Sequence, residues 1–138
     1  MTDGSDRRAE RMLWLGVALF VAGRIVDLVW HATHPEFETA ADQIRAHAVV
    51  WLGVLAMVGA SATAVQRGIR SGGHRLVVAA GGLYVAVAVW HFWEHTQLRD
   101  PDLPHLLLTV ASVLLIGGAA WVAVVRLRRR GGAATGAG

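Results

Sequence analysis

Long apolar stretches alternate with short polar connections along this chain. The apolar stretches cover residues 12–30, 47–65, 76–93 and 103–125. Each approaches or exceeds the ~20 residues that an α-helix needs to cross the hydrocarbon core of a bilayer. The pattern therefore predicts an all-α integral membrane protein, a bundle of four transmembrane helices. We do not expect the first stretch to be a cleavable signal peptide, because Arg24 and Asp27 interrupt it.

The arginines predict how these helices are oriented. Three groups flank the apolar stretches on one side: Arg7, Arg8 and Arg11; Arg67, Arg70 and Arg75; Arg126, Arg128, Arg129 and Arg130. The other two connections contain only Arg45 and Arg99, set among acidic residues. Because cytoplasmic loops carry the excess of basic residues, we expect both termini and the middle connection to be cytoplasmic. The protein would then be a multi-pass protein of the plasma membrane.

The chain divides into a central membrane domain and two short ends. Residues 1–11 form a predicted cytoplasmic N-terminal segment, and residues 12–127 form the four-helix transmembrane domain. Residues 128–138 end in a run of Gly, Ala and Thr. Such a low-complexity sequence predicts a disordered cytoplasmic tail.

Composition narrows the class of protein. Hydrophobic residues make up 54% of the 138, with a mean hydropathy of +0.45, which is too apolar for a soluble domain of this length. Cysteine is absent, which excludes disulfides, thiolate metal sites and thiol redox chemistry. A sequence pI near 11.0 is also typical of nucleic-acid-binding proteins, but here the arginines flank apolar stretches. We therefore expect membrane lipid as a partner, and no nucleic acid.

The histidines are distributed unevenly. His74 falls in the middle connection, where we expect it to be solvated, and six others lie toward the predicted outer ends of the spans: His31, His34, His47, His91, His95 and His105. Counting from the nearest cytoplasmic arginine, His31, His47 and His95 each lie 20 residues away and His105 lies 21 away. At ~1.5 Å per residue, one histidine from every helix stands ~30 Å above the cytoplasmic boundary.

Helical spacing places two carboxylates on the same helix faces as these histidines. Asp27, His31 and His34 are related as i, i+4 and i+7, and therefore share one face of the first helix. In the third helix His91, Glu94 and His95 share a face in the same way. Ligand-bearing stripes at matching depth are what a metal site inside a helical bundle needs. The sequence thus predicts a site that contains all six outer histidines.

An arginine and an aspartate inside the first apolar stretch need a partner, since an ionised side chain in a bilayer costs about 2.5–3.5 kcal/mol. A structural i, i+3 salt bridge between Arg24 and Asp27 is one explanation. In the other, Asp27 binds the metal or orients His31, while Arg24 balances its charge. Tyr84, below His91, is either a packing residue or a proton donor.

A short internal similarity links the two halves of the chain. The segment Val29-Trp30-His31 resembles Val89-Trp90-His91, and each is followed by a further histidine, His47 or His105. If this is a repeat, two parallel helical hairpins are related by a pseudo-twofold axis along the membrane normal.

Several cofactors fit these residues. Imidazole with carboxylate suits iron, copper or zinc, bound as one ion or as a dinuclear centre. Haem b is the alternative cofactor, with His31 and His91 or His47 and His105 as axial ligands. A third interpretation needs no cofactor, because single histidines also occur as polar anchors at the interface.

Two function classes follow. In the first, the protein is a membrane oxidoreductase that acts on a lipid-soluble substrate or redox partner, such as a quinone or an acyl chain. Asp27, Glu94 and Arg24 would then be its catalytic groups. In the second, it binds or transfers a metal ion, or serves in assembly, without catalysis. An open coordination position would favour the enzyme, and a closed ligand shell would favour binding.

Overall fold

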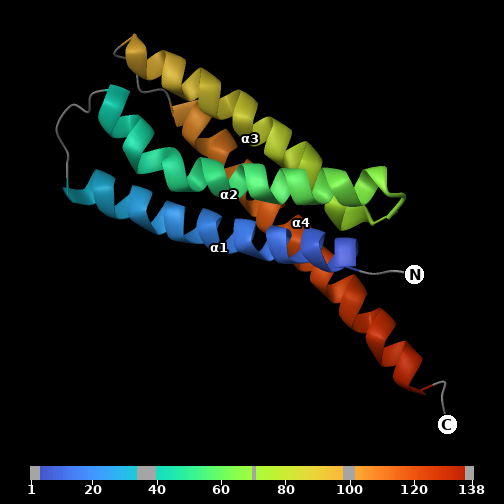
Figure 1. Ribbon diagram of the computed structural model, residues 1–138. Helices are drawn as coiled ribbons and strands as arrows, with labels where there is room; N and C mark the ends of the chain where they lie inside the picture. The colour runs from blue at the N-terminus through green and yellow to red at the C-terminus, as the bar shows by residue number, and fades with distance from the viewer. Residues whose placement is uncertain (1–3, 34–39, 70, 98–101, 136–138) are drawn as a thin grey trace.

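The computed structural model describes residues 4–33, 40–69, 71–97 and 102–135 (Figure 1). These residues form four helices: α1 (Gly4–Thr33), α2 (Ala40–Gln66), α3 (Gly72–Thr96) and α4 (Asp102–Thr135). Each contains a segment long and apolar enough to cross a membrane: Arg7–Thr33, His47–Gln66, Gly72–Glu94 and Asp102–Arg128. The predicted all-helical four-helix bundle is confirmed.

Large apolar side chains cover the outside of the bundle. Leu28 on α1 is 71% exposed, Leu55 on α2 59%, Trp93 on α3 62% and Val113 on α4 66%. A water-soluble protein of this size does not expose so much continuous apolar surface. The surface suits a surrounding of lipid hydrocarbon.

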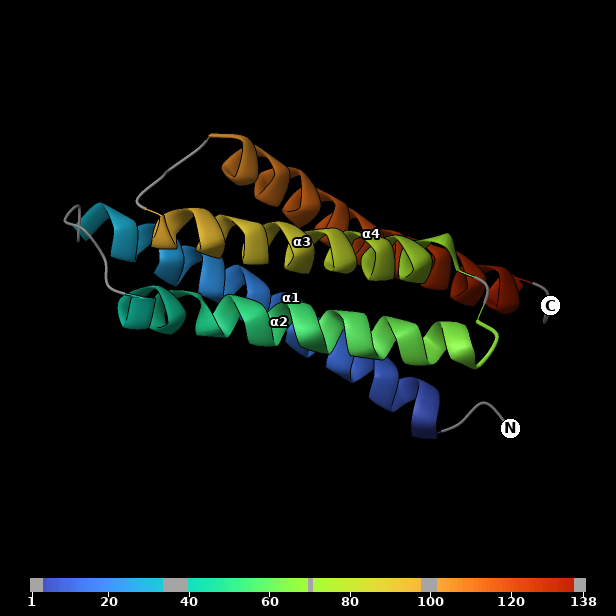
Figure 2. The same cartoon turned by 90° about the horizontal axis from the view of Figure 1, so that it is seen from above.

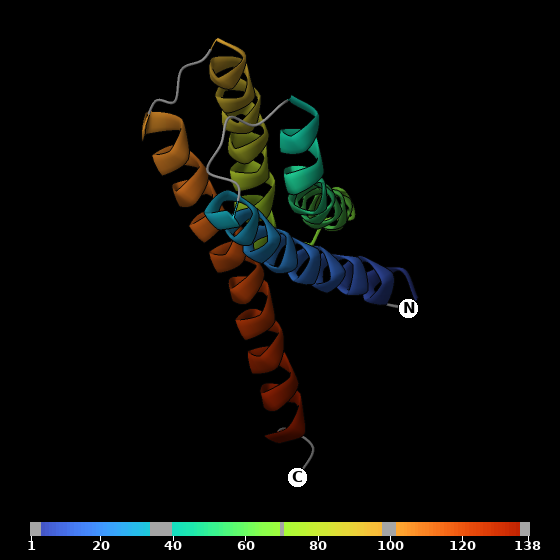
Figure 3. The same cartoon turned by 90° about the vertical axis from the view of Figure 1, so that its left-hand side faces the viewer.

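The bundle consists of two tightly packed hairpins. Contacts are densest between α1 and α2 and between α3 and α4, while those of α2 with α3 and of α1 with α4 are sparser. Figures 2 and 3 show the two hairpins from above and from the side. At Gly53 of α2 an added Cβ would collide with the backbone of Phe20 in α1, and at Gly73 of α3 with that of Gly118 in α4. Small residues allow such close approach of helices in membranes.

The connection between the hairpins is a compact turn. Gly68 has a φ of +80° and its N–H donates to Val65 O (3.0 Å), while Ile69 N–H donates to Ala64 O (3.0 Å). This pair of bonds is a Schellman motif, which ends α2 with glycine in the left-handed conformation. The chain reverses within a few residues, and α3 begins at Gly72.

His74 differs from its predicted place. We expected it to be solvated in the middle connection, but α3 begins before the apolar stretch does and places His74 in its first turn. There it is 9% exposed, with Nδ1 3.3 Å from the Ser61 hydroxyl of α2. The prediction of a solvated His74 is wrong, because the helix extends beyond its apolar core.

At the C-terminal end, α4 extends beyond its apolar stretch. α4 continues to Thr135, through most of the segment 128–138 in which we expected disorder. The arginines at 128–130 have high helix propensity and can extend a helix that is already formed. Residues 136–138 lie outside the described part of the chain.

Candidate metal centre

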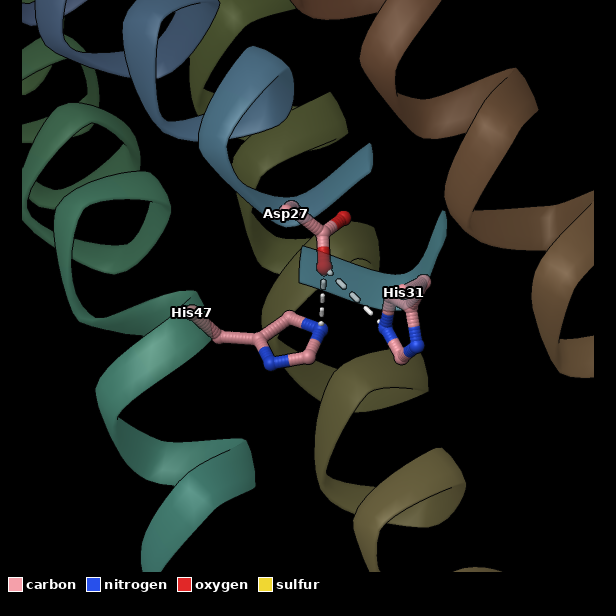
Figure 4. Close-up of side chains that lie close together, drawn as sticks. All are labelled: Asp27, His31 and His47. Carbon is pink, nitrogen blue, oxygen red and sulfur yellow. Dashed lines mark ion pairs between the residues drawn. The ribbon is translucent and has the colours of Figure 1, made fainter. Parts of the chain in front are cut away.

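Three ligand-type side chains meet where α1 and α2 face each other (Figure 4). Oδ1 of Asp27 lies 3.0 Å from Nε2 of His47 and 3.3 Å from Nε2 of His31. One donor atom from each residue lies within 4.8 Å of the other two. Among the described residues, no other group of three or more histidines and carboxylates meets this criterion.

The group runs from the interior of the bundle to its surface. Asp27 is 5% exposed, whereas the side chain of His47 is 24% exposed and that of His31 is 48% exposed. The carboxylate therefore forms the floor of the site, and the imidazoles stand at its opening. A ligand or a water molecule can reach the group from the His31 side.

Arg24 fixes the orientation of the carboxylate. Its Nη1 donates to Oδ2 of Asp27 at 2.6 Å, one turn deeper in α1. This confirms the i, i+3 salt bridge expected from the sequence. Oδ1 is left facing the imidazoles, and it is buried without a hydrogen bond of suitable geometry within the described chain. Tyr84 of α3, which is 2% exposed, lies near this charged pair.

Helix packing brings His47 to this level. A Cβ added to Gly23 of α1 would collide with the backbone of Val50 in α2, so the two helices touch there without an intervening side chain. Asp27 lies one turn beyond Gly23, and His47 lies one turn before Val50, in the same direction along the bundle. The two side chains therefore meet just above the closest approach of the helices.

The distances are compatible with metal binding. Zinc binds nitrogen or oxygen ligands at about 2.0–2.2 Å, which separates ligand atoms by about 2.8–3.6 Å at octahedral or tetrahedral angles. Both distances from Oδ1 lie in this range. The ligand nitrogens of His31 and His47 lie within 4.8 Å of each other. At that limit, they would have to move closer together to bind one ion. A side-chain rotation of partly exposed His31 can supply that change.

Two further histidines form a second pair. The rings of His91 on α3 and His105 on α4 are edge-to-face, with centroids 4.3 Å apart and planes at 71°. The rings of His31 and His47 are arranged similarly, at 5.8 Å and 66°. Each hairpin thus carries one pair of histidines. In the described structure the pairs proposed for haem, His31 with His91 and His47 with His105, are replaced by pairs within the hairpins.

Not every predicted site residue belongs to the group. Glu94 accepts a hydrogen bond from Nε1 of Trp90 (3.0 Å) on an exposed edge of α3. His34 lies outside the described residues, and the same holds for the side chain of His95, whose backbone belongs to α3. The single level of four histidines predicted by counting is represented in the described group by His31 and His47 alone.

Sequence reasoning underrated Tyr84. Its phenol lies near the charged pair of Arg24 and Asp27, whereas the sequence left it between packing and proton donation. One signal was available: Arg24 and Tyr84 are separated by 60 residues, as are His31 and His91. Arg24 precedes His31 by the same number of residues as Tyr84 precedes His91, so the two residues occupy equivalent positions in the proposed repeat.

Neither a family model nor a curated protein nor a solved structure matches this chain.

Proposed function

We propose that this protein is a membrane metal-binding protein in which Asp27, His31 and His47 hold one divalent transition-metal ion. The observation that carries the proposal is the buried Oδ1 of Asp27, which faces Nε2 of both histidines. A buried carboxylate oxygen needs a compensating partner, and a metal ion shared with the two imidazoles supplies one. The group lies toward the C-terminal end of α1 and the N-terminal end of α2.

The donor set restricts the ion. Two imidazole nitrogens and one carboxylate oxygen suit zinc, iron(II) or copper(II), and leave one or more coordination positions open. Calcium and magnesium prefer oxygen ligands, and copper(I) prefers sulfur. The exposed side of His31 provides access to the open position.

The charges favour an exchangeable ion. Arg24 already neutralises Asp27, so a bound dication competes with the guanidinium for the same carboxylate. Three protein ligands, one of them half exposed, also make a weaker site than the four ligands of a structural zinc centre. These features support reversible binding or transfer of the ion more than permanent retention.

The second histidine pair supports the proposal of two hairpin repeats. His31 and His91 are 60 residues apart, and His47 and His105 are 58 apart. Position 87 corresponds to Asp27 and is a buried valine. On this proposal the two hairpins are related by a pseudo-twofold axis, and only the first has a carboxylate with which to complete a site.

The proposed site faces the outside of the cell. Arginines cluster around the termini and the turn between α2 and α3, which by the positive-inside rule places these parts in the cytoplasm. Asp27 and its histidines then lie near the outer surface of the plasma membrane. The ion would exchange with the extracytoplasmic medium.

Oxidoreductase activity stays a prediction. The open position and the nearby Tyr84 phenol would suit electron or proton transfer to a lipid-soluble substrate. Reduction or oxidation of a quinone by the metal-loaded protein in bilayers would support this function. A bound ion with no such turnover would leave binding and transfer as the function.

Elemental analysis of the detergent-purified protein, with its visible spectrum, tests the proposal. We expect one zinc, iron or copper ion per chain after metal supplementation, and no haem Soret band. His47→Ala should lose the ion, whereas His74→Gln, at the other end of the bundle, should retain it. A wild-type protein without metal, or equal loss from both variants, would contradict the proposal.

A further inference from the structure

A cavity of about 380 Å³ lies at the end of the bundle opposite the Asp27 group. It occupies the space between α1 and α4, where these helices make few contacts, and the ends of α2 and α3 close it. Its volume is within the range of small-molecule sites. The lining residues are Arg7, Ala9, Glu10, Leu13, Ala64, Ile69, Ser71, His74, Val122, Val125 and Arg126.

The walls of the cavity separate into an apolar part and a polar part. Leu13 and Ala64 are 0% and 2% exposed, and with two valines of α4 they form an apolar wall. Arg7 and Arg126, near the ends of their membrane-spanning segments, form the polar side. A ligand that fills the whole cavity must therefore have a hydrocarbon part and a polar part.

The charged residues of the lining determine which charge on a ligand's polar group is favoured. Glu10 of α1 forms an ion pair with Arg126 of α4 across the opening between the two helices. With Arg7, two guanidiniums and one carboxylate line the cavity, so hydrogen-bond donors to an anion predominate among its ionised groups. An anion is thus favoured over a cation.

Two neutral groups add hydrogen-bonding capacity. Oγ of Ser71 is buried and has no hydrogen-bond partner in the described structure. His74 uses Nδ1 toward Ser61, which leaves Nε2 as the ring atom available to a molecule in the cavity. A hydroxyl and an imidazole beside two guanidiniums suit the oxygens of a phosphate or carboxylate.

We propose that this cavity binds an anionic amphiphile, a molecule with a phosphate or carboxylate head and an acyl chain, taken from the surrounding leaflet as a phospholipid. Arg7 and Arg126 bind the head, and the wall formed by Leu13, Ala64 and the α4 valines contacts the chain. The acyl chain would enter between α1 and α4, which make few contacts with each other. Free phosphate would leave the apolar wall in contact with water.

Native mass spectrometry of the full-length protein tests this inference. Wild-type protein, released from nanodiscs of phosphatidylcholine with one fifth phosphatidylglycerol, should retain one phosphatidylglycerol per chain in preference to phosphatidylcholine. Equal retention of the two lipids would overturn the proposal. Inorganic phosphate in millimolar amounts should not displace the lipid; displacement, with the same thermal stabilisation by phosphate alone, would assign the cavity to a small anion instead.

Substitutions of the ion pair separate a binding role from a packing role. Arg126→Gln should lower phosphatidylglycerol retention by at least about fivefold, since one arginine near anionic lipid is worth ~1 kcal/mol. Glu10→Gln breaks the same ion pair but removes the negative charge, and should raise retention by a similar factor. If both variants lose lipid equally, the ion pair merely holds the helices together and the proposal fails.

A neighbouring arginine provides the matched control. Arg128 is exposed on α4, two residues beyond Arg126, and does not line the cavity. Arg128→Gln should retain lipid as the wild type does; a loss equal to that of Arg126→Gln would show diffuse attraction to the anionic surface and overturn a defined site. Ala9→Phe, which fills the cavity from its rim, should abolish retention while the helical circular dichroism stays unchanged. Full retention by this variant would also contradict the proposal.

Discussion

Nε2 of His47 lies 3.0 Å from Oδ1 of Asp27, across the interface between α2 and α1. The distance fits a hydrogen bond from the imidazole as well as two ligands of one metal ion. Its partner oxygen, Oδ2, is held by Arg24 at 2.6 Å. The carboxylate thus has one oxygen for charge compensation and one for the imidazoles, and the following predictions depend on this division.

Asp27→Asn should reduce metal content to the level of His47→Ala. The amide keeps the size and one acceptor oxygen but loses the negative charge that binds the ion. If Asp27 only orients the imidazoles, affinity should instead fall about 10–100-fold, with some metal retained. Isothermal titration with zinc distinguishes these outcomes. Retention of wild-type affinity would remove Asp27 from the site.

Arg24→Gln should increase metal affinity about tenfold, which corresponds to ~1.4 kcal/mol. The guanidinium forms a charge-assisted hydrogen bond with Asp27, and bonds of this kind contribute about 1.5–3 kcal/mol, which the dication must partly offset. The same substitution should lower the melting temperature of the metal-free protein, because Asp27 then stays buried without a cation. A loss of metal affinity would mean that Arg24 positions the carboxylate for binding.

The substitution His91→Ala tests whether the protein binds one metal ion per chain or two. His91 and His105 form their own pair on α3 and α4. If the Asp27 group is the only site, the variant should keep the stoichiometry of the wild type, measured by elemental analysis. A fall from two ions per chain to one would establish a second ion at the His91 pair, and complete loss would establish one site shared between the hairpins.

Gly53→Ala should weaken both the fold and the site. The new methyl group would collide with the backbone of Phe20, and overpacking of this kind costs about 1–3 kcal/mol. Separation of α1 from α2 also moves His47 away from Asp27, so metal affinity should fall together with the melting temperature.

Gly59→Ala is the matched control for that substitution. Gly59 lies on the same helix, and a Cβ added there would meet nothing within 4 Å. We expect it to be neutral or slightly stabilising, because alanine has the higher helix propensity. Equal destabilisation by the two variants, in thermal melts in the same detergent, would show that α2 does not tolerate alanine in general.

Single cysteines test the proposed orientation. The natural chain has none, so Thr39→Cys and Ala133→Cys each introduce one thiol. A membrane-impermeant maleimide on intact cells should label position 39 and not position 133, since the positive-inside rule places the latter in the cytoplasm. The reverse pattern would move the Asp27 group to the cytoplasmic face.

Residue counting predicted the level of a side chain but not its neighbours. His31 and His47 are each 20 residues from an arginine, and their ring centroids lie 5.8 Å apart in the structure. The rise per residue determines height along an axis, whereas the rotation of each helix and the choice of adjacent helix depend on packing. Counting therefore could not predict that His91 pairs with His105 on its own hairpin.

The close contact of α1 with α2 at Gly23 and Gly53 determines which part of the chain contains the candidate metal centre. Asp27, His31 and His47 all lie within residues 4–69, before the end of the Schellman turn, and Arg24 lies there too. All three proposed ligands thus belong to one helical hairpin, and the second hairpin contributes Tyr84 as a neighbour. Changes confined to α3 and α4 therefore leave the three ligand-type side chains on the same pair of packed helices.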